Sequence, residues 1–258
     1  MKHLLARRHR PFLERLANGR LLLGLDFDGT LAPIVPRPDR VRMRASTRRL
    51  LAAVAERYPT AVISGRARDD VAKYVAGVTL PLVVGNHGME WPEPTKSAER
   101  VVQRVAGWRE RLAGLLRGAP GIEIEDKRYS LSVHFRRARD ADEALAAIMG
   151  AIGTLPGCRG QPGKLVVNVL PEKSADKGTA LRLAMRRLRC DTALFVGDDT
   201  TDEDAFALEP TGAVHGCRVG ASRRSHASWY VPSQEDVDDL LNALLVLRAP
   251  QRAERRNP

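Results

Sequence analysis

The stretch Leu21-Leu-Leu-Gly-Leu-Asp-Phe-Asp-Gly-Thr-Leu31 decides how this chain is interpreted. Its apolar start is typical of a strand that is buried on both faces of a parallel sheet. Because side chains alternate in direction along a strand, Asp26 and Asp28 are expected to point the same way. Open α/β sheets bind their ligands at the carboxyl ends of such strands. Two neighbouring carboxylates there need a cation or a shared proton.

Three further predicted strands lie along the chain, and each ends in polar residues. The sequence between them reads as helix, and strands that alternate with helices are typical of a doubly wound parallel sheet. The polar residues should therefore meet at one edge of the sheet. The segments are Thr60–Ile63 before Ser64-Gly65-Arg66, Leu82–Val84 before Gly85-Asn86-His87-Gly88, and Thr192–Val196 before Gly197-Asp198-Asp199-Thr200-Thr201-Asp202-Glu203-Asp204.

Each of these strand exits also has a purely structural interpretation. The Ser-Gly pair is common turn chemistry, and the glycines around Asn86 and His87 suit a sharp turn. In the last segment, Thr201 and Asp204 match a variant of the helix capping box. That interpretation leaves the two acids directly after the strand unexplained.

The pattern changes between residues 91 and 170, where two helices and short antiparallel strands predict an α+β unit. The expected helices are Ser97–Leu116 and Asp140–Ile152, and the expected strands are Ile122–Asp126, Leu131–Phe135 and Leu165–Leu170. The expected fold is therefore an α/β core at residues 1–90 and 171–248 with this smaller cap inserted at residues 91–170. The core would begin with an amphipathic helix over Met1–Arg20, and a disordered basic tail would occupy residues 249–258.

One face of the predicted strand Leu131–Phe135 is polar. Ser132, His134 and Arg136 alternate there with apolar residues, and Glu125-Asp-Lys127 precedes them. Such alternation usually marks a sheet face that is exposed to solvent.

Composition narrows the function further. The formal net charge is +11, from 42 Lys and Arg against 31 Asp and Glu, which can indicate nucleic acid or an anionic ligand. Aromatic residues make up only 5%, and no aromatic residues alternate with the basic ones to form a stacking surface. We therefore interpret the excess of basic residues as solvated helix faces and expect no nucleic-acid partner.

Three widely spaced cysteines argue against a disulfide framework or a zinc site. No run reaches membrane-spanning length, so we expect a cytoplasmic protein without a membrane partner.

Four segments resemble, in order, the motifs of the haloacid-dehalogenase (HAD) superfamily of phosphotransferases. They are Asp-Phe-Asp-Gly-Thr, Ser-Gly-Arg, Lys177-Gly178 at the start of a predicted helix, and Gly-Asp-Asp-x-Thr-Asp-Glu. Gly-Asn-His-Gly, Glu-Asp-Lys and Leu-Ser-x-His-x-Arg make the chain similar to the trehalose-6-phosphate phosphatase family in particular. This resemblance spans about residues 21 to 231 and implies a HAD-like doubly wound core with an inserted cap.

The resemblance implies Mg²⁺-dependent phosphoryl transfer through an aspartyl-phosphate. Asp26 would be the nucleophile and Asp28 the general acid and base, while Ser64 and Lys177 would bind the phosphate; Lys177 fits better than Lys173. The Asp26 side chain, the Asp28 backbone carbonyl and Asp198 would bind Mg²⁺, with Asp199 or Asp202 outside the first coordination sphere. The implied substrate contacts are Gly65, Arg66, Asn86, His87, Glu125, Lys127, His134, Arg136 and Asn168.

The function implied is hydrolysis of trehalose 6-phosphate, a disaccharide phosphate, by a monomer. The sequence departs from the family in the strand before Pro171, where Asn168 and Leu170 replace the usual glutamate and arginine. Asparagine can hydrogen-bond a hydroxyl group but has no charge. A phosphatase of the mannosyl-3-phosphoglycerate or sucrose-phosphate type is therefore an alternative. A non-catalytic nucleic-acid or anion-binding module is a more distant one.

Overall fold

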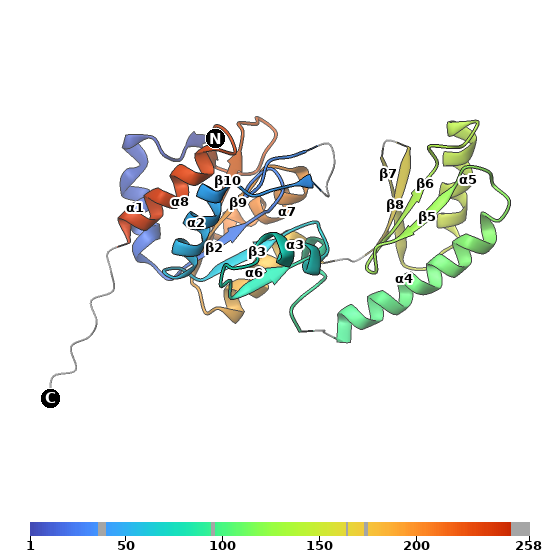
Figure 1. Ribbon diagram of the computed structural model, residues 1–258, viewed down its shortest axis with the longest axis horizontal. Coiled ribbons are helices and arrows are strands. Elements are labelled where there is room, and N and C mark those ends of the chain that lie inside the picture. The colour runs from blue at the N-terminus through green and yellow to red at the C-terminus, as the bar shows by residue number, and fades with distance from the viewer. Residues whose placement is uncertain (36–39, 94–95, 164, 173–174, 249–258) are drawn as a thin grey trace. The chain divides into compact units, whose positions relative to one another are not determined.

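The computed structural model describes residues 1–35, 40–93, 96–163, 165–172 and 175–248. They form two compact units, of which the first comprises Met1–Gly88 with the chain from Asp176 onward, and the second Met89–Ala175 (Figure 1). The assignment of these units as core and cap stays a prediction, and the expected tail at residues 249–258 lies outside the described residues, as does Lys173. Within the described ranges, no helix has both the length and the apolar character that a membrane span requires.

The first unit is built on a parallel sheet of seven strands in the order β1-β11-β10-β9-β2-β3-β4. Every pair of neighbours in it is parallel, which confirms the predicted α/β class. The strands are β1 (Lys2–His3), β2 (Leu21–Leu25), β3 (Thr60–Ile63), β4 (Leu82–Val84), β9 (Thr192–Gly197), β10 (Val214–Val219) and β11 (Trp229–Val231). Strand β2 lies between β9 and β3, so the carboxyl end of β2 is flanked by those of two neighbours.

Helices cover both faces of this sheet. They are α1 (Arg10–Asn18), α2 (Ala45–Ala55), α3 (Arg68–Tyr74), α6 (Lys177–Arg187), α7 (Glu203–Phe206) and α8 (Asp236–Leu247), with short 3₁₀ helices η1 (Arg7–His9), η3 (Asn86–Gly88), η4 (Thr200–Asp202) and η5 (Glu209–Thr211). Leu23 and Leu25 face a cluster that includes residues of α1, α2 and α8. Gly24 instead faces Leu181 of α6 and Phe195 of β9, so both faces of β2 are buried. This double burial is why the strand is apolar throughout.

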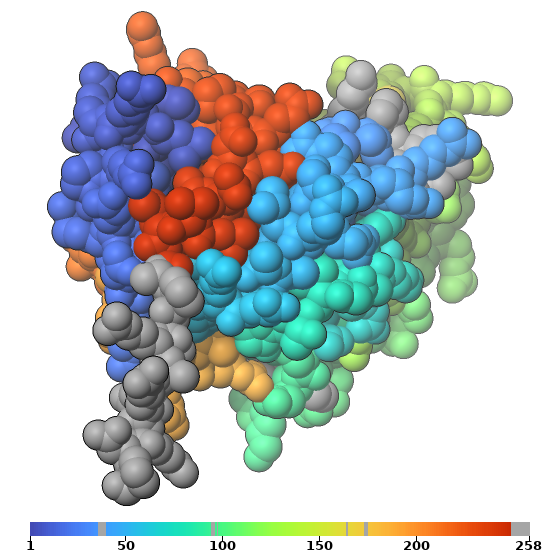
Figure 2. Space-filling model, turned by 60° about the vertical axis from the view of Figure 1, so that its left-hand side comes forward, coloured from blue at the N-terminus to red at the C-terminus, as the bar shows by residue number. Residues whose placement is uncertain are grey.

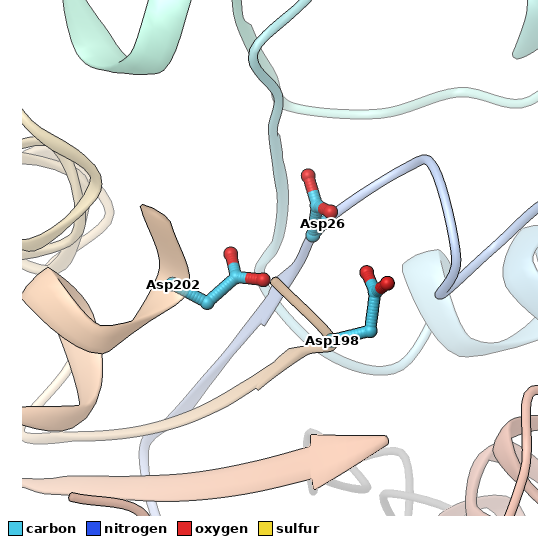
Figure 3. A group of neighbouring side chains, drawn as sticks. All are labelled: Asp26, Asp198 and Asp202. Atoms are coloured by element: carbon cyan, nitrogen blue, oxygen red, sulfur yellow. The ribbon is translucent and has the colours of Figure 1, made fainter. Parts of the chain in front are cut away.

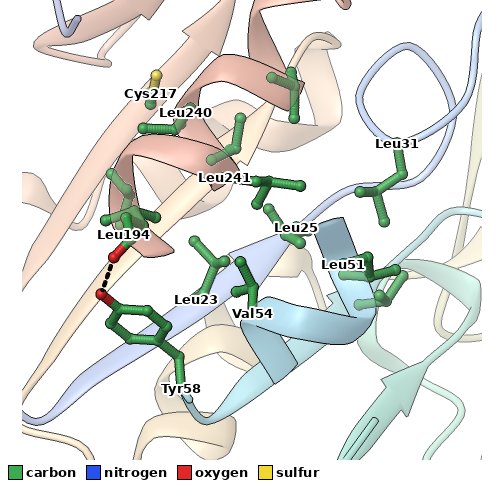
Figure 4. Packing of buried hydrophobic residues seen from close by; sticks show 14 of the residues in the cluster. Leu23, Leu25, Leu31, Leu51, Val54, Tyr58, Leu194, Cys217, Leu240 and Leu241 are labelled. Carbon is green, nitrogen blue, oxygen red and sulfur yellow. Dashed lines mark hydrogen bonds between the residues drawn. The ribbon is translucent and has the colours of Figure 1, made fainter. Parts of the chain in front are cut away.

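The packing between α2 and α8 shows how distant segments close the core. Tyr58, just after α2, donates a hydrogen bond of 2.8 Å from its hydroxyl to the carbonyl of Leu244 in α8 (Figure 4). The buried tyrosine thus satisfies its polar atom while its ring stays among Leu and Val side chains. Helices α1 and α8, near opposite ends of the chain, lie side by side on the surface of the first unit (Figure 2).

The single N-terminal helix predicted for Met1–Arg20 is wrong. Strand β1 instead adds to the sheet edge, where Lys2 N donates to Ser228 O at 2.8 Å and Leu4 N to Tyr230 O at 3.0 Å. Leu4 is fully buried as a result, and α1 starts only at Arg10, with Pro11 in its first turn. A two-residue strand has no alternation to detect, and its partner lies more than two hundred residues further along the chain.

The second unit is an antiparallel sheet with two helices on one face. Its four strands have the order β5-β6-β8-β7, and the apolar residues of the central strands pack with Trp108 and Ile148 of the helices. The elements are α4 (Lys96–Leu115), β5 (Glu123–Asp126), β6 (Leu131–His134), α5 (Ala141–Gly153), β7 (Cys158–Gly163) and β8 (Val166–Pro171). The sequence predicted this α+β arrangement but missed β7, because Pro162 and the glycines around it are uncommon in strands.

Candidate active site

The site is built around the carboxyl end of β2. Asp26 continues the ladder of the strand, because its N–H donates to Val196 O at 2.9 Å. Its side chain is only 5% exposed. The chain then turns at Gly29, whose φ of +77° lies in the left-handed region. This turn follows Asp28, which is half-buried, whereas Asp26 two residues earlier is buried.

Gly29 is also a point of close approach. A Cβ on this residue would lie 2.1 Å from Oδ2 of Asp198, far inside van der Waals contact. The missing side chain therefore makes room for the Asp198 carboxylate, which follows β9 at the neighbouring strand exit. The Asp-Phe-Asp-Gly-Thr and Gly-Asp-Asp-x-Thr-Asp-Glu segments meet here, as the sequence predicted from the parallel sheet.

Three carboxylates gather at this edge (Figure 3). Asp26, Asp198 and Asp202 each place an oxygen within 4.8 Å of the others. They come from the end of β2, the end of β9 and the 3₁₀ helix η4. Asp199, the other acid considered for the outer sphere, is exposed and lies outside this cluster.

Lys177 holds two of these carboxylates. Its Nζ lies 2.8 Å from Oδ1 of Asp26 and 2.7 Å from Oδ1 of Asp202, and the side chain is 2% exposed. Burial alone would lower the pKa of Lys177, but the two carboxylates raise it above its ordinary value. A cation at the first turn of α6 opposes the helix dipole, and these anions offset that cost. Asp176 caps the helix by accepting a hydrogen bond from Thr179 N.

The acidic loop after β9 is closed by a capping box, but at other residues than the sequence suggested. The expected pair was Thr201 with Asp204, whereas the structure pairs Asp199 with Asp202. Oδ2 of Asp202 accepts a hydrogen bond of 2.9 Å from Asp199 N, and Oδ1 accepts from Lys177. The helix starts earlier than predicted, at Thr200, which moves the cap to Asp199.

Ser64 and Arg66 follow β3. Ser64 is buried, and its Oγ accepts a hydrogen bond of 3.2 Å from Arg66 N. Arg66 donates Nε and Nη2 to the two carboxylate oxygens of Asp28 at 2.6 and 2.7 Å, and Nη1 lies 3.2 Å from Asp70. Its guanidinium also lies over the ring of Tyr74. The arginine expected to contact substrate is thus bound to the expected general acid and base.

The Gly85–Gly88 segment packs directly against this turn. Asn86 and His87 both have positive φ, at 48° and 56°, and His87 N donates to Ser64 O at 2.9 Å. A Cβ on Gly65 would lie 2.5 Å from the His87 ring, so Gly65 allows the ring to approach. Asn86 itself is buried.

The acidic cluster is chemically suited to a divalent cation. Burial raises the pKa of Asp26 to about 7, and burial followed by the neighbouring acids Asp202 and Asp199 raises the pKa of Asp198 to about 6. Oδ1 of Asp198 is buried and has no hydrogen-bond partner among the described residues. A cation would satisfy this oxygen and relieve the repulsion. Oxygen-only ligands suit Mg²⁺, so the carboxylates of Asp26 and Asp198 are compatible with such an ion.

The second unit contains the other predicted contact residues, with Glu125, His134 and Asn168 on the strands of its sheet and Lys127 and Arg136 just beyond the strand ends. The backbone register places Glu125 opposite Ser132, and Ser132 opposite Asn168. Ser132 Oγ donates to Asn168 Oδ1 at 2.7 Å, and Glu125 Oε2 lies 2.9 Å from His134 Nε2 and 3.8 Å from Lys127 Nζ. Glu125, Ser132 and Asn168 therefore form one polar row across the sheet, with His134 and Lys127 beside Glu125.

A cavity of about 610 Å³ opens beside this row. Its lining residues are Gly121, Ile122, Glu123, Glu125, His134, Arg136 and Arg137. Glu123 was not among the predicted residues, although its spacing of two from Glu125 places both on the same face. Gln161, which the register places opposite Asn168, was missed because β7 was not predicted.

Comparisons with known proteins identify the family. The model of the trehalose-phosphatase family matches residues 24–238. The rice protein named "Probable trehalose-phosphate phosphatase 9" is 33% identical over 89% of this chain and 71% of its own length. The solved Aspergillus fumigatus trehalose-6-phosphate phosphatase has 26% identity and a TM-score of 0.71, covering 95% of this chain and 99% of that one.

The similarity covers part of the length of the curated relatives and extends to more distant proteins of the same fold. The chain spans 62% to 72% of the full length of seven curated relatives from plants and mycobacteria. A HAD-superfamily phosphatase from Bacteroides thetaiotaomicron matches 90% of this chain and 96% of its own with a TM-score of 0.54 at 18% identity, which shows a shared fold. The chain has the HAD fold and belongs to the trehalose-phosphatase family, a family of phosphatases.

Proposed function

We propose that this protein hydrolyses trehalose 6-phosphate to trehalose and phosphate in a Mg²⁺-dependent reaction. The main support is the buried arrangement of Asp26, Lys177 and Asp198 at the end of β2, together with membership of the family. Asp26 supplies a nucleophilic carboxylate, Lys177 supplies an ammonium group beside it, and Asp198 supplies a second carboxylate for the metal. Phosphoryl transfer through an aspartyl-phosphate uses groups of these kinds.

In the proposed first step, an Asp26 oxygen attacks phosphorus and the bond from phosphorus to the sugar oxygen breaks. Asp28 donates a proton to the leaving sugar oxygen. In the second step, water attacks the resulting aspartyl-phosphate, Asp28 takes a proton from that water, and phosphate is released. Arg66 donates two short hydrogen bonds to Asp28 and so orients the group that gives up a proton in the first step and takes one in the second.

Lys177 has two functions in this scheme. Its ammonium group lies 2.8 Å from Asp26 and favours the ionised nucleophile against the effect of burial. The same charge would stabilise the phosphate oxygens in the transition state, with the Ser64 hydroxyl as a further donor. Mg²⁺ bound by Asp26, Asp198 and the Asp28 carbonyl would neutralise charge on the phosphate.

The sugar is proposed to contact five polar side chains of the second unit. Glu125, Lys127, His134, Arg136 and Asn168 offer acceptors and donors of the kind that bind hydroxyl groups. Gly65, Arg66, Asn86 and His87 are proposed to contact the substrate from the first unit. No membrane or nucleic-acid partner is proposed.

A related sugar-phosphate phosphatase is the second candidate. The specific observation in its favour is the neutral Asn168, hydrogen-bonded to Ser132, where the family commonly has a charged residue. A disaccharide phosphate of the sucrose-phosphate type or mannosyl-3-phosphoglycerate would then be the substrate.

A substrate panel separates these candidates. Phosphate release from trehalose 6-phosphate, sucrose 6-phosphate, mannosyl-3-phosphoglycerate and glucose 6-phosphate would be measured with Mg²⁺ and with a chelator. We expect the highest kcat/KM on trehalose 6-phosphate and loss of activity with the chelator. A higher kcat/KM on another sugar phosphate would contradict the proposed substrate. Salt-sensitive nucleic-acid binding without phosphate release from any of these compounds would contradict the proposal that the protein is a phosphatase.

We also propose that the protein acts as a monomer in the cytoplasm. The three cysteines are free in the structure, which suits a reducing compartment. Light scattering during gel filtration and localisation of a tagged protein would test these two points.

A further inference from the structure

Asp198 differs from the other two acids of the cluster in how it is held. Asp26 and Asp202 are both fixed by Lys177. Oδ1 of Asp198 has no hydrogen-bond partner within the described ranges. No hydrogen bond to this oxygen fixes the direction of the carboxylate, which therefore depends on its close approach to Gly29 and on the backbone that carries the side chain.

Both backbone polar groups of the next residue, Asp199, are hydrogen-bonded. The N–H of Asp199 donates to Asp202 Oδ2 at 2.9 Å. The carbonyl of Asp199 accepts a hydrogen bond of 3.2 Å from Nη1 of Arg218. The two peptide groups that follow Asp198 are thus fixed in orientation by two different side chains.

Arg218 is well placed for this contact. It lies in β10, where its Cα is the register partner of Gly197 in β9, and its side chain is 18% exposed. The same Nη1 atom lies 3.2 Å from Oε1 of Glu203, and Oε2 of Glu203 accepts from His226 N at 2.8 Å. The guanidinium thus links the acidic loop to the start of α7.

We infer that Arg218 is a positioning residue for Asp198, which it directs towards the metal by fixing the Asp199 carbonyl. The inference rests on the proposed metal-dependent function, since it assigns Arg218 a part in building that site. Residues that orient metal ligands in this way commonly change metal affinity when they are removed.

The sign of the effect distinguishes positioning from simple electrostatics. Arg218 is a cation near the proposed Mg²⁺ site, so its charge alone repels the ion. Removal of that charge would therefore strengthen Mg²⁺ binding if position did not matter. The positioning role predicts the opposite, because a displaced Asp198 weakens binding.

The test is calorimetric titration of Mg²⁺ into the metal-free full chain, with thermal unfolding measured on the same samples. We expect Arg218→Met to weaken Mg²⁺ affinity roughly 10–100-fold and Arg218→Lys, which keeps the charge, to lie between it and the wild type. Arg223→Met is the control, because Arg223 is an exposed arginine shortly after the same strand, and its Mg²⁺ affinity should be unchanged.

A folded Arg218→Met protein with unchanged or tighter Mg²⁺ binding would overturn the inference, even if its melting temperature fell. If Arg218→Met does not fold, the Mg²⁺ affinity of Arg218→Lys becomes the test. An affinity equal to that of the wild type would then overturn the inference. The proposed function fails separately, when the wild-type protein neither binds Mg²⁺ nor releases phosphate. In that case the role of Arg218 is rejected with it.

Discussion

The substitution Gly29→Ala separates the geometry of the site from the stability of the fold. The new Cβ would lie 2.1 Å from Oδ2 and 2.3 Å from Cγ of Asp198, whereas ordinary contact begins at 3.4 Å. The carboxylate must therefore move by about 1.3 Å. A displacement of this size at a reacting group costs about 100-fold in rate. Alanine at a φ of +77° also strains the backbone by about 1–2 kcal/mol.

Gly77→Ala is a matched control for the backbone strain that alanine introduces at a positive φ. Gly77 has a φ of +84°, and a Cβ on this residue would have nothing within 4 Å of it, so the substitution introduces the strain without the clash. Both variants should lower the melting temperature, Gly77→Ala by roughly 2–8 °C and Gly29→Ala by at least as much, because the clash adds to the strain. Only Gly29→Ala should lose about 100-fold in kcat/KM and bind Mg²⁺ more weakly.

The assays are phosphate release at saturating Mg²⁺, Mg²⁺ titration and thermal unfolding on the two variants and the wild type. Wild-type kcat/KM and Mg²⁺ affinity in a folded Gly29→Ala protein would refute the reasoning, because Asp198 could not then be a ligand in the observed position. Equal losses of activity in both variants would point to backbone strain instead.

Three further outcomes are expected. Because burial raises the folded-state pKa of Asp26 to about 7 and of Asp198 to about 6, the metal-free fold should lose stability from these groups as the pH rises from 4 to 8. Mg²⁺ should offset that loss, so its stabilising shift in thermal unfolding should be larger at pH 8 than at pH 5.5; an equal shift would contradict the site. Arg66→Met should lower kcat about 100-fold, because Asp28 loses its two hydrogen bonds, and Arg66→Lys should restore part of the lost kcat; a rise in KM with unchanged kcat would mean that Arg66 contacts the substrate without orienting Asp28. Asn168→Leu should raise KM up to about tenfold at constant kcat, and steady-state kinetics showing an unchanged KM would remove Asn168 from the sugar contacts.

Much of the first unit could be predicted from local pattern. The apolar run before Asp26 identified the central strand, and the parallel arrangement brought Asp198 next to it. Lys177 was predicted from its resemblance to a motif, and its contact with Asp26 fits that assignment. These features depend on short segments whose composition and spacing are visible in the sequence.

The features that were missed depend on contacts between distant segments. Strand β1 exists because it pairs with β11, and neither short strand has a pattern of its own. The capping box moved from Thr201 to Asp199 because Lys177 and Asp199 both bind Asp202. No local signal connects Arg218 with the acidic loop, because only the pairing of β9 with β10 brings them together.

In the second unit, too, local pattern predicted some features, and others depend on contacts between distant segments. Alternation predicted the polar face that contains Glu125 and His134. The row from Glu125 through Ser132 to Asn168 appears only once the strand register is known. The role of this row in binding a sugar stays a prediction.

The most direct test of the central claim is to locate the phosphoryl group during turnover. Substrate labelled in its phosphate would be mixed with enzyme and Mg²⁺, quenched in acid and digested, and the label mapped to a peptide. The account predicts label on the peptide that contains Asp26, and no label or turnover in a folded Asp26→Asn protein. Phosphate release at the wild-type rate by that variant, with Asp26 never labelled in the wild type, would contradict it.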